Sequence, residues 1–200
     1  MSSSGNKTLK TLPESIGYLV NLQELNLDKC KVLEGLPDSI GNLINLRELH
    51  MRECKCVTEL PASIGDCSSL VEISLSKCMG LKKLPGSIGR LANLEDLILT
   101  KCKHLEQLPD EIGQCRALVL LELRNCKSLQ SLPASMGQLT NLRQLNLSTC
   151  KKLTSIPAEL GDLPKLEELD VSNCISLSSL PESLDKFRTV VIGWELVKKK

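Results

Sequence analysis

Hydrophobic and polar positions along this chain repeat every 24 residues. Prolines mark one point of each unit, at positions 13, 37, 61, 85, 109, 133, 157 and 181. Cysteines mark a second point, at positions 30, 54, 78, 102, 126, 150 and 174. No insertion or deletion interrupts either series. A fixed period of this length predicts stacked structural repeats, each of which contacts mainly its two neighbours.

Each unit contains the pattern LxxLxLxxC, which predicts a short strand followed by a turn. In one unit, Leu145 and Leu147 alternate with the polar residues Gln144 and Asn146. Alternation with a period of two places the leucines on one face of the strand and the polar side chains on the other. We expect the strands of successive units to pair in register into a parallel sheet whose polar face is a concave wall.

The second half of each unit brings the chain back to the core. After the turn, Leu153 and Ile156 point inward, Pro157 begins a short helical or irregular segment, and Leu160 points inward again. One unit alone cannot cover its own apolar face, so stacking is obligatory. Because the helical side is bulkier than the strand side, the stack should bend. The predicted fold is an α/β solenoid with a concave parallel β-sheet and a convex face of short helical or irregular segments.

Composition narrows the possible functions. Hydrophobic residues make up 42% of the chain, yet it has only one Trp, one Tyr and one Phe, so leucine and isoleucine must fill the core. The net charge of +1 provides no overall field for nucleic acid. No run approaches the roughly 18 apolar residues of a membrane span, and the first residues lack the apolar region of a secretory signal. We therefore expect a soluble, cytoplasmic protein that binds neither nucleic acid nor membranes.

No catalytic or cofactor-binding motif is found in the sequence. A Gly-rich phosphate loop, a GxSxG elbow and an HExxH helix are all absent. Cys54 with Cys56, and Cys102 with His104, are residue types that bind metals, but no CxxC pair or second ligand cluster accompanies them. His50 and His104 replace residues that cannot bind metal in sister units. The sequence predicts a protein that is not an enzyme and has no cofactor or metal.

The cysteines are expected to be free thiols with a structural role. Those of the 24-residue series end the strand pattern, where each S–H can donate weakly to a backbone carbonyl. Neighbouring members lie about one strand spacing apart, a geometry that does not suit a disulfide. Cys67 and Cys115 occupy a position that is leucine in other units and should fill the core. Cys56 alone should be exposed.

The repeat units resemble a known family. The segments LPESIGYLVNLQELNLDKC and LPASMGQLTNLRQLNLSTC resemble the plant intracellular class of leucine-rich repeats, especially the repeat region of plant nucleotide-binding disease-resistance proteins. The resemblance covers residues 9–187 and implies a leucine-rich-repeat arc, a horseshoe segment. It also implies recognition of a protein partner, which includes other domains of a larger receptor, and a role in immune sensing or autoinhibition. The nucleotide-binding and signalling domains of that family are absent from this chain.

The ends of the chain depart from the repeat. Residues 1–8 should form a flexible segment, residues 9–187 the array, and residues 188–200 a capping strand followed by a basic tail. Trp194 should shield the open end of the core, and Lys198, Lys199 and Lys200 should be solvated. Only Leu9 and Leu12 belong to a partial first repeat, so the N-terminal end should be poorly capped.

Two exposed columns follow from the alignment of the strands. The first column, before the central strand leucine, is mostly acidic: Glu24, Glu48, Glu72, Asp96, Leu120, Gln144 and Glu168. The third column, after that leucine, holds Asn26, His50, Ser74, Ile98, Glu122, Asn146 and Asp170. A basic ridge, one residue past each cysteine of the series, should border them.

An apolar break near the middle of the array is the candidate binding site. Ile98 and Leu120 interrupt the two polar columns, and Val71 and Val119 replace polar neighbours. We call these four residues the central apolar set. Exposed apolar side chains rimmed by charge are typical of a protein contact. The predicted protein-binding residues are Val71, Glu72, Asp96, Ile98, Val119, Leu120 and Glu122. The alternatives are scattered aliphatic residues among solubilising charges, and a structural or consensus-like repeat fragment with no dedicated partner.

Overall fold

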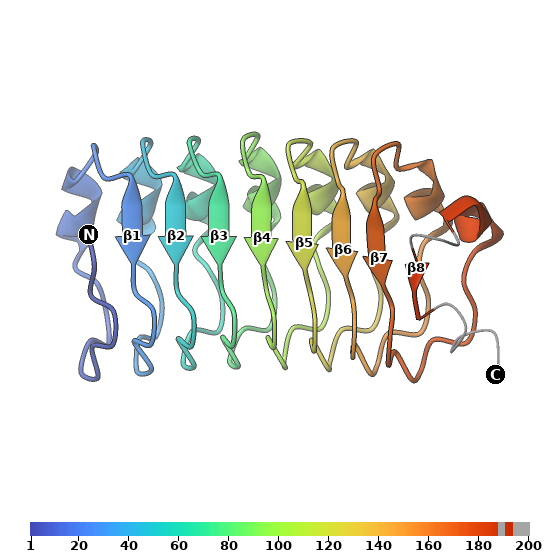
Figure 1. The fold of residues 1–200 in the computed structure, drawn as a ribbon. Helices are drawn as coiled ribbons and strands as arrows, with labels where there is room; N and C mark the ends of the chain where they lie inside the picture. Colours follow the sequence, from blue (N-terminus) through green and yellow to red (C-terminus); the bar gives the residue numbers. More distant parts are fainter. Residues whose placement is uncertain (188–190, 194–200) are drawn as a thin grey trace.

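The computed structural model describes residues 1–187 and 191–193. In this part of the chain, eight strands form one parallel sheet in the order of the sequence (Figure 1). The strands are β1 Glu24–Asn26, β2 Glu48–His50, β3 Glu72–Ser74, β4 Asp96–Ile98, β5 Leu120–Glu122, β6 Gln144–Asn146, β7 Glu168–Asp170 and β8 Val191–Ile192. The predicted solenoid with a parallel sheet is confirmed.

A short 3-10 helix precedes each strand and lies in a second layer behind the sheet (Figure 1). The helices are η1 Glu14–Tyr18, η2 Asp38–Asn42, η3 Ala62–Asp66, η4 Gly86–Arg90, η5 Asp110–Gln114, η6 Ala134–Gln138, η7 Ala158–Asp162 and η8 Glu182–Phe187. Proline is the N-cap residue of η1 to η7, where its fixed φ and missing N–H suit a helix start. Among the described residues, no helix is long and apolar enough to cross a membrane.

The core lies between the sheet and the helices and is built from aliphatic side chains together with cysteines and methionines. The middle residue of each strand from β1 to β7, such as Leu25 or Leu97, is fully buried. So is the leucine that follows strands β1 and β4, Leu27 and Leu99. Burying each of these side chains contributes roughly 1.5–3 kcal/mol. The predicted alternation of inward leucines with outward polar residues is confirmed.

The thiols of the cysteine series form a regular set of hydrogen bonds. Each Sγ donates to the backbone carbonyl 27 residues earlier, for example Cys54 to Leu27 at 3.1 Å and Cys78 to Met51 at 3.0 Å. The other members, Cys30, Cys102, Cys126, Cys150 and Cys174, make the same bond at 3.1–3.2 Å. The expected thiol-to-carbonyl contact is confirmed, and each contact joins one repeat to the preceding repeat.

The turn before each of these cysteines adopts a left-handed backbone. The residues with φ between 59° and 64° are Lys29, Glu53, Lys77, Lys101, Asn125, Thr149 and Asn173. Asparagine tolerates this region, whereas a β-branched residue such as Thr149 is strained there. The N–H groups of this turn point to the next repeat: Lys29 donates to the carbonyl of Arg52 and Thr149 to that of Ser172. Contacts between repeats therefore hold the turn in its conformation.

The two ends of the sheet depart from the regular 24-residue pairing. Residues 1–5 lie along β1, where Asn26 donates its N–H to Met1 and Ser3 donates its own to Asn26. The first residues are thus hydrogen-bonded to the sheet where a flexible segment was expected. At the other end, Val191 of β8 pairs with Leu169 of β7. The sequence separation between these paired residues is two residues shorter than the 24 that separate paired residues in the other strands. Trp194 and Lys198–Lys200 lie outside the described residues.

We predict that the glycine before the last residue of each of the helices η1 to η7 is required for stacking. A Cβ on Gly65 would lie 2.3 Å from the carbonyl oxygen of Ser87 in the next repeat. Gly65→Ala should therefore lower the free energy of unfolding by about 2 kcal/mol or more, because the backbones must separate. Urea unfolding measures the loss. Gly35→Ala is the matched control, since nothing lies within 4 Å of its Cβ, and equal losses in both variants would contradict the close-approach argument.

We also predict that one thiol reacts quickly in the native protein. Nine cysteines are buried and Cys56 alone is exposed. Burial raises the pKa of the Cys54 and Cys78 thiols to about 12, so little thiolate forms at pH 8. Alkylation at that pH should modify Cys56 first and the other nine only after denaturation. Mass spectrometry counts the modified sites, with Cys56→Ser as control; several rapidly modified thiols in folded Cys56→Ser protein would contradict this packing.

Candidate protein-binding surface

The outer face of the sheet carries the two columns that the alignment predicted. The first column is exposed or half-buried, whereas the third, which was expected to be exposed, is half-buried, with His50 and Ser74 buried. In the first column, Glu24 of β1 lies beside Glu48 of β2, which lies beside Glu72 of β3. In the third column, Ser74 of β3 lies beside Ile98 of β4 and Ile98 beside Glu122 of β5. Side chains directly opposite each other on neighbouring strands interact. The face therefore presents long rows of closely spaced polar groups on a rigid backbone.

The carboxylates near the middle of the sheet are partly desolvated. Burial is the main cause that raises the pKa of Asp96, and the charge of Glu95 adds to it. Burial also raises the pKa of Glu122, opposed by the hydrogen bond that the Thr100 hydroxyl donates to its carboxylate at 3.1 Å. Both acidic side chains are half-buried. They are held against the sheet and are not free in solvent.

The central apolar set is half-buried and interleaved with these acids. Leu120 lies directly beside Asp96, and Ile98 lies directly beside Glu122. Val119 precedes Leu120 in the chain. Glu95 lies between Val71 and Val119: its N–H donates to the backbone carbonyl of Val71, and its carbonyl accepts from the N–H of Val119. The structure thus places Ile98 in β4, Leu120 in β5 and Val119 immediately before β5. Val71 lies on the far side of an acidic residue.

A shallow groove of about 320 Å³ runs along the N-terminal half of this face. It is lined by Gln23, Glu24, Arg47, Glu48, Val71, Glu72 and Asp96. Three of the predicted binding residues, Val71, Glu72 and Asp96, therefore share one depression. Its lining is mostly charged, which suits polar side chains of a partner more than an apolar small molecule.

The predicted basic ridge lines a second groove at the turns below the strands. This groove has a volume of about 450 Å³ and is lined by Glu53, Lys55, Lys77, Met79, Lys101, Lys103, Asn125 and Lys127. Lys77 is paired with Glu53 at 2.7 Å. The acidic face and the basic groove give the array two surfaces of opposite charge.

An apolar cluster at the N-terminal end was not predicted from the sequence. Tyr18 is 84% exposed, and Leu19, Val20 and Ile44 are 44–54% exposed. Tyr18 occupies a position that is polar or charged in the following units, and this substitution was the available signal. The cluster lies where the helical layer leads into β1 and β2, away from the predicted site.

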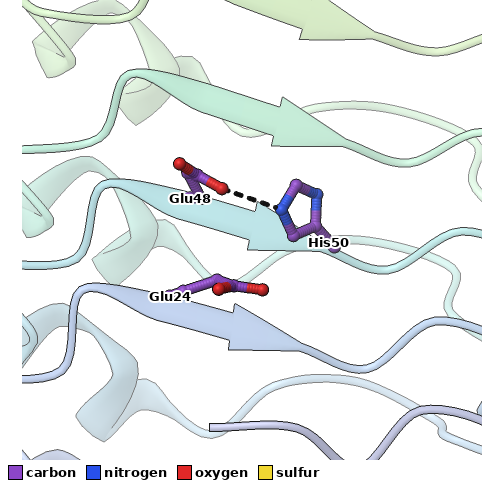
Figure 2. Close-up of side chains that lie close together, drawn as sticks. All are labelled: Glu24, Glu48 and His50. Carbon is purple, nitrogen blue, oxygen red and sulfur yellow. Dashed lines mark hydrogen bonds and ion pairs between the residues drawn. The ribbon is translucent and has the colours of Figure 1, made fainter.

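A second missed feature is a histidine among carboxylates. His50 lies close to Glu48 and Glu24 on the exposed face of the sheet (Figure 2). His50 was not expected to belong to a metal site, because it replaces residues that cannot bind metal in sister units. By contrast, the Cys102 thiol donates to Leu75, and His104 is bound through Nδ1 to the carbonyl of Met79. Within the described residues, Cys102 and His104 are not part of a potential metal cluster.

Comparisons with known proteins agree with this architecture. Residues 75–194 match the leucine-rich repeat region family, and residues 21–43 match a single leucine-rich repeat. No curated protein sequence is significantly similar to the chain.

Solved structures share the fold over most of the chain. The leucine-rich repeat domain of the type III effector XopL is 25% identical, with a TM-score of 0.68 over 96% of this chain and 75% of that chain. A leucine-rich repeat protein of Leptospira interrogans is 29% identical, with a TM-score of 0.54 over 92% of this chain and 57% of that one. Since the match over residues 75–194 alone spans more than half of the sequence, the protein belongs to the leucine-rich repeat family.

Proposed function

We propose that this protein is an interaction scaffold that recognises a partner protein through the exposed face of its sheet. Leucine-rich repeat domains are general protein-interaction modules, which supports binding over catalysis. The observation that carries the proposal is the central apolar set, held half-buried among Glu72, Asp96 and Glu122 on paired strands. Apolar anchors inside a charged rim are the arrangement that dominates affinity in protein interfaces. The net charge of +1 favours neither nucleic acid nor an anionic membrane as the partner.

The finer role we propose is plant immune sensing in the cytoplasm. Its support is the resemblance of the LPxSIGxLxNL segments and cysteine-type turns to the repeat region of plant disease-resistance proteins. In that setting the partner is a foreign or modified protein, or another domain of a larger receptor. The alternative is a repeat fragment with no dedicated partner, and the two differ in whether any protein binds specifically.

We predict that placing charge in the central apolar set abolishes this binding. Ile98→Asp combined with Leu120→Asp introduces two carboxylates beside Glu122 and Asp96. Loss of a central anchor typically costs 2 kcal/mol or more, which is roughly a 30-fold rise in Kd. Like charges directly opposite each other on paired strands lower stability, so the melting temperature should fall, and binding is measured well below it, where circular dichroism shows the double variant to be folded.

The experiment exposes the immobilised wild type, the double variant and a control variant to plant cell extract. Kd is then measured for any purified partner. The control is Ile44→Asp, the same chemical change at a residue that is 54% exposed and outside the sheet. The proposal requires a protein retained by the wild type and by Ile44→Asp but lost with the double variant. Equal retention by all three folded proteins would contradict the site, and no specific retention would favour the structural alternative.

A further inference from the structure

His50 is the most buried charged or basic side chain on the exposed face of the described sheet. Its side chain is 10% exposed, although it points from the same face as the exposed Glu48. Nε2 lies 3.2 Å from Oε2 of Glu48, and Nδ1 lies 3.6 Å from Oε1 of Glu72. Glu24 approaches from the strand on the other side (Figure 2). Three carboxylates from three strands thus surround one imidazole.

This arrangement leaves a neutral imidazole with an unfavourable contact in either tautomer. A neutral ring has one N–H and one nitrogen lone pair. If Nε2 carries the proton, it donates to Glu48 and the lone pair of Nδ1 faces Glu72. If Nδ1 carries the proton, the lone pair of Nε2 faces Glu48. Nδ1 is buried and makes no hydrogen bond, so a buried polar atom is left unsatisfied, a situation that native proteins rarely tolerate.

A bound cation removes the conflict. With a metal ion at Nε2, the proton moves to Nδ1 and can be donated to Glu72. Histidines that bind metals usually donate their other ring N–H to a carboxylate, which fixes the tautomer and the ring orientation. Glu72 is placed to accept that proton, and its distance of 3.6 Å needs only a small closure.

The ligand atoms are already gathered by the register of the sheet. One oxygen from Glu24, one from Glu48 and one ring nitrogen of His50 lie within 4.8 Å of one another. Ligands at 2.0–2.2 Å around a tetrahedral ion lie about 3.4 Å apart. Glu24 and Glu48 are exposed side chains whose rotation can supply the difference. The three-strand row of Glu24, Glu48 and Glu72 also concentrates negative charge that a cation neutralises.

We propose that Glu24, Glu48 and His50 bind a divalent transition-metal ion of the zinc class, with Glu72 as the positioning residue. Imidazole nitrogen together with carboxylate oxygen suits such ions better than Ca²⁺ or Mg²⁺, which prefer oxygen ligands alone. Three protein ligands leave a fourth position open to water or to a group from a partner. The site does not depend on the proposed protein-binding function, because its ligands lie in β1 and β2, outside the central apolar set.

The test titrates ZnCl₂ alone into the metal-free full chain by isothermal calorimetry. We expect one ion per chain at a site that His50→Asn removes. His104→Asn is the matched control, because His104 is the other histidine of the chain, is exposed and bonds to a backbone carbonyl. Circular dichroism establishes that each variant is folded. If His50→Asn unfolds the protein, Glu24→Gln with Glu48→Gln replaces it, since both side chains are exposed.

Two further measurements separate this site from adventitious binding. Glu72→Gln should weaken zinc binding roughly 10- to 100-fold without changing the stoichiometry, as expected for a carboxylate that orients a ligating histidine. Co²⁺ used in place of zinc should show no thiolate-to-metal charge-transfer absorption, because no cysteine is a ligand. Absence of zinc binding, binding that survives the loss of His50 or of both glutamates, or a thiolate signal would each overturn the proposal.

Discussion

The structure depends on one constraint, the constant register between a residue and its counterpart 24 residues later. Strand pairing follows this offset from β1 to β7. The cysteine thiols donate to the preceding repeat. Most ion pairs join residues that are 24 positions apart in neighbouring repeats: Arg52 with Asp28, Lys77 with Glu53, Lys83 with Glu59, Arg90 with Asp66, and Arg143 with Glu167. Exposed pairs of this kind contribute little stability individually. Their regularity shows that every layer of the molecule has the same repeat length.

The same register accounts for the uninterrupted 24-residue period between β1 and β7. Side chains alternate with a period of two, so a shift of one residue would move a buried leucine such as Leu97 to the exposed face. It would also separate the Cys102 thiol from the carbonyl of Leu75. A shift in the 3-10 helices that replaced Gly65 by another residue would place a Cβ against the backbone of Ser87 in the next repeat. A shift in register would therefore disrupt the contacts of the strands, the cysteine turns and the 3-10 helices together.

The features predictable from the sequence are those that repeat. The alternation around Leu145 and the position of each cysteine follow from the period alone, and both agree with the structure. Features set by tertiary contacts do not follow from it. Thr149 adopts a left-handed backbone that its residue type disfavours, because its N–H is bound by the next repeat. The shorter offset at β8 is likewise decided by the pairing of Val191 with Leu169, where the sequence alone would align Gly193 with that leucine.

The candidate sites show a related limit. Aligning repeats compares residues within one column, and this comparison identified Ile98 and Leu120 as departures from polar columns. The same columns place Leu120 beside Asp96 and Ile98 beside Glu122, as observed, but they do not show that all four side chains are half-buried. The role of His50 was inferred only from the residues at the same position in other repeats. Its chemistry arises from Glu48 two residues earlier and from Glu24 and Glu72 on the neighbouring strands.

The two proposed sites share one acidic row, and this has a physical consequence. Glu72 and Asp96 lie side by side in the first column between the proposed metal ligands and the central apolar set. Strands are spaced about 4.8 Å apart, so the ion and Asp96 would be separated by roughly one Debye length at physiological salt. An ion would therefore reduce the negative potential at the rim while leaving Ile98 and Leu120 unchanged. Rim charges act mainly on association rate and salt dependence, and buried anchors act on affinity. Metal occupancy would accordingly adjust how quickly a charged partner arrives more than how tightly it is held.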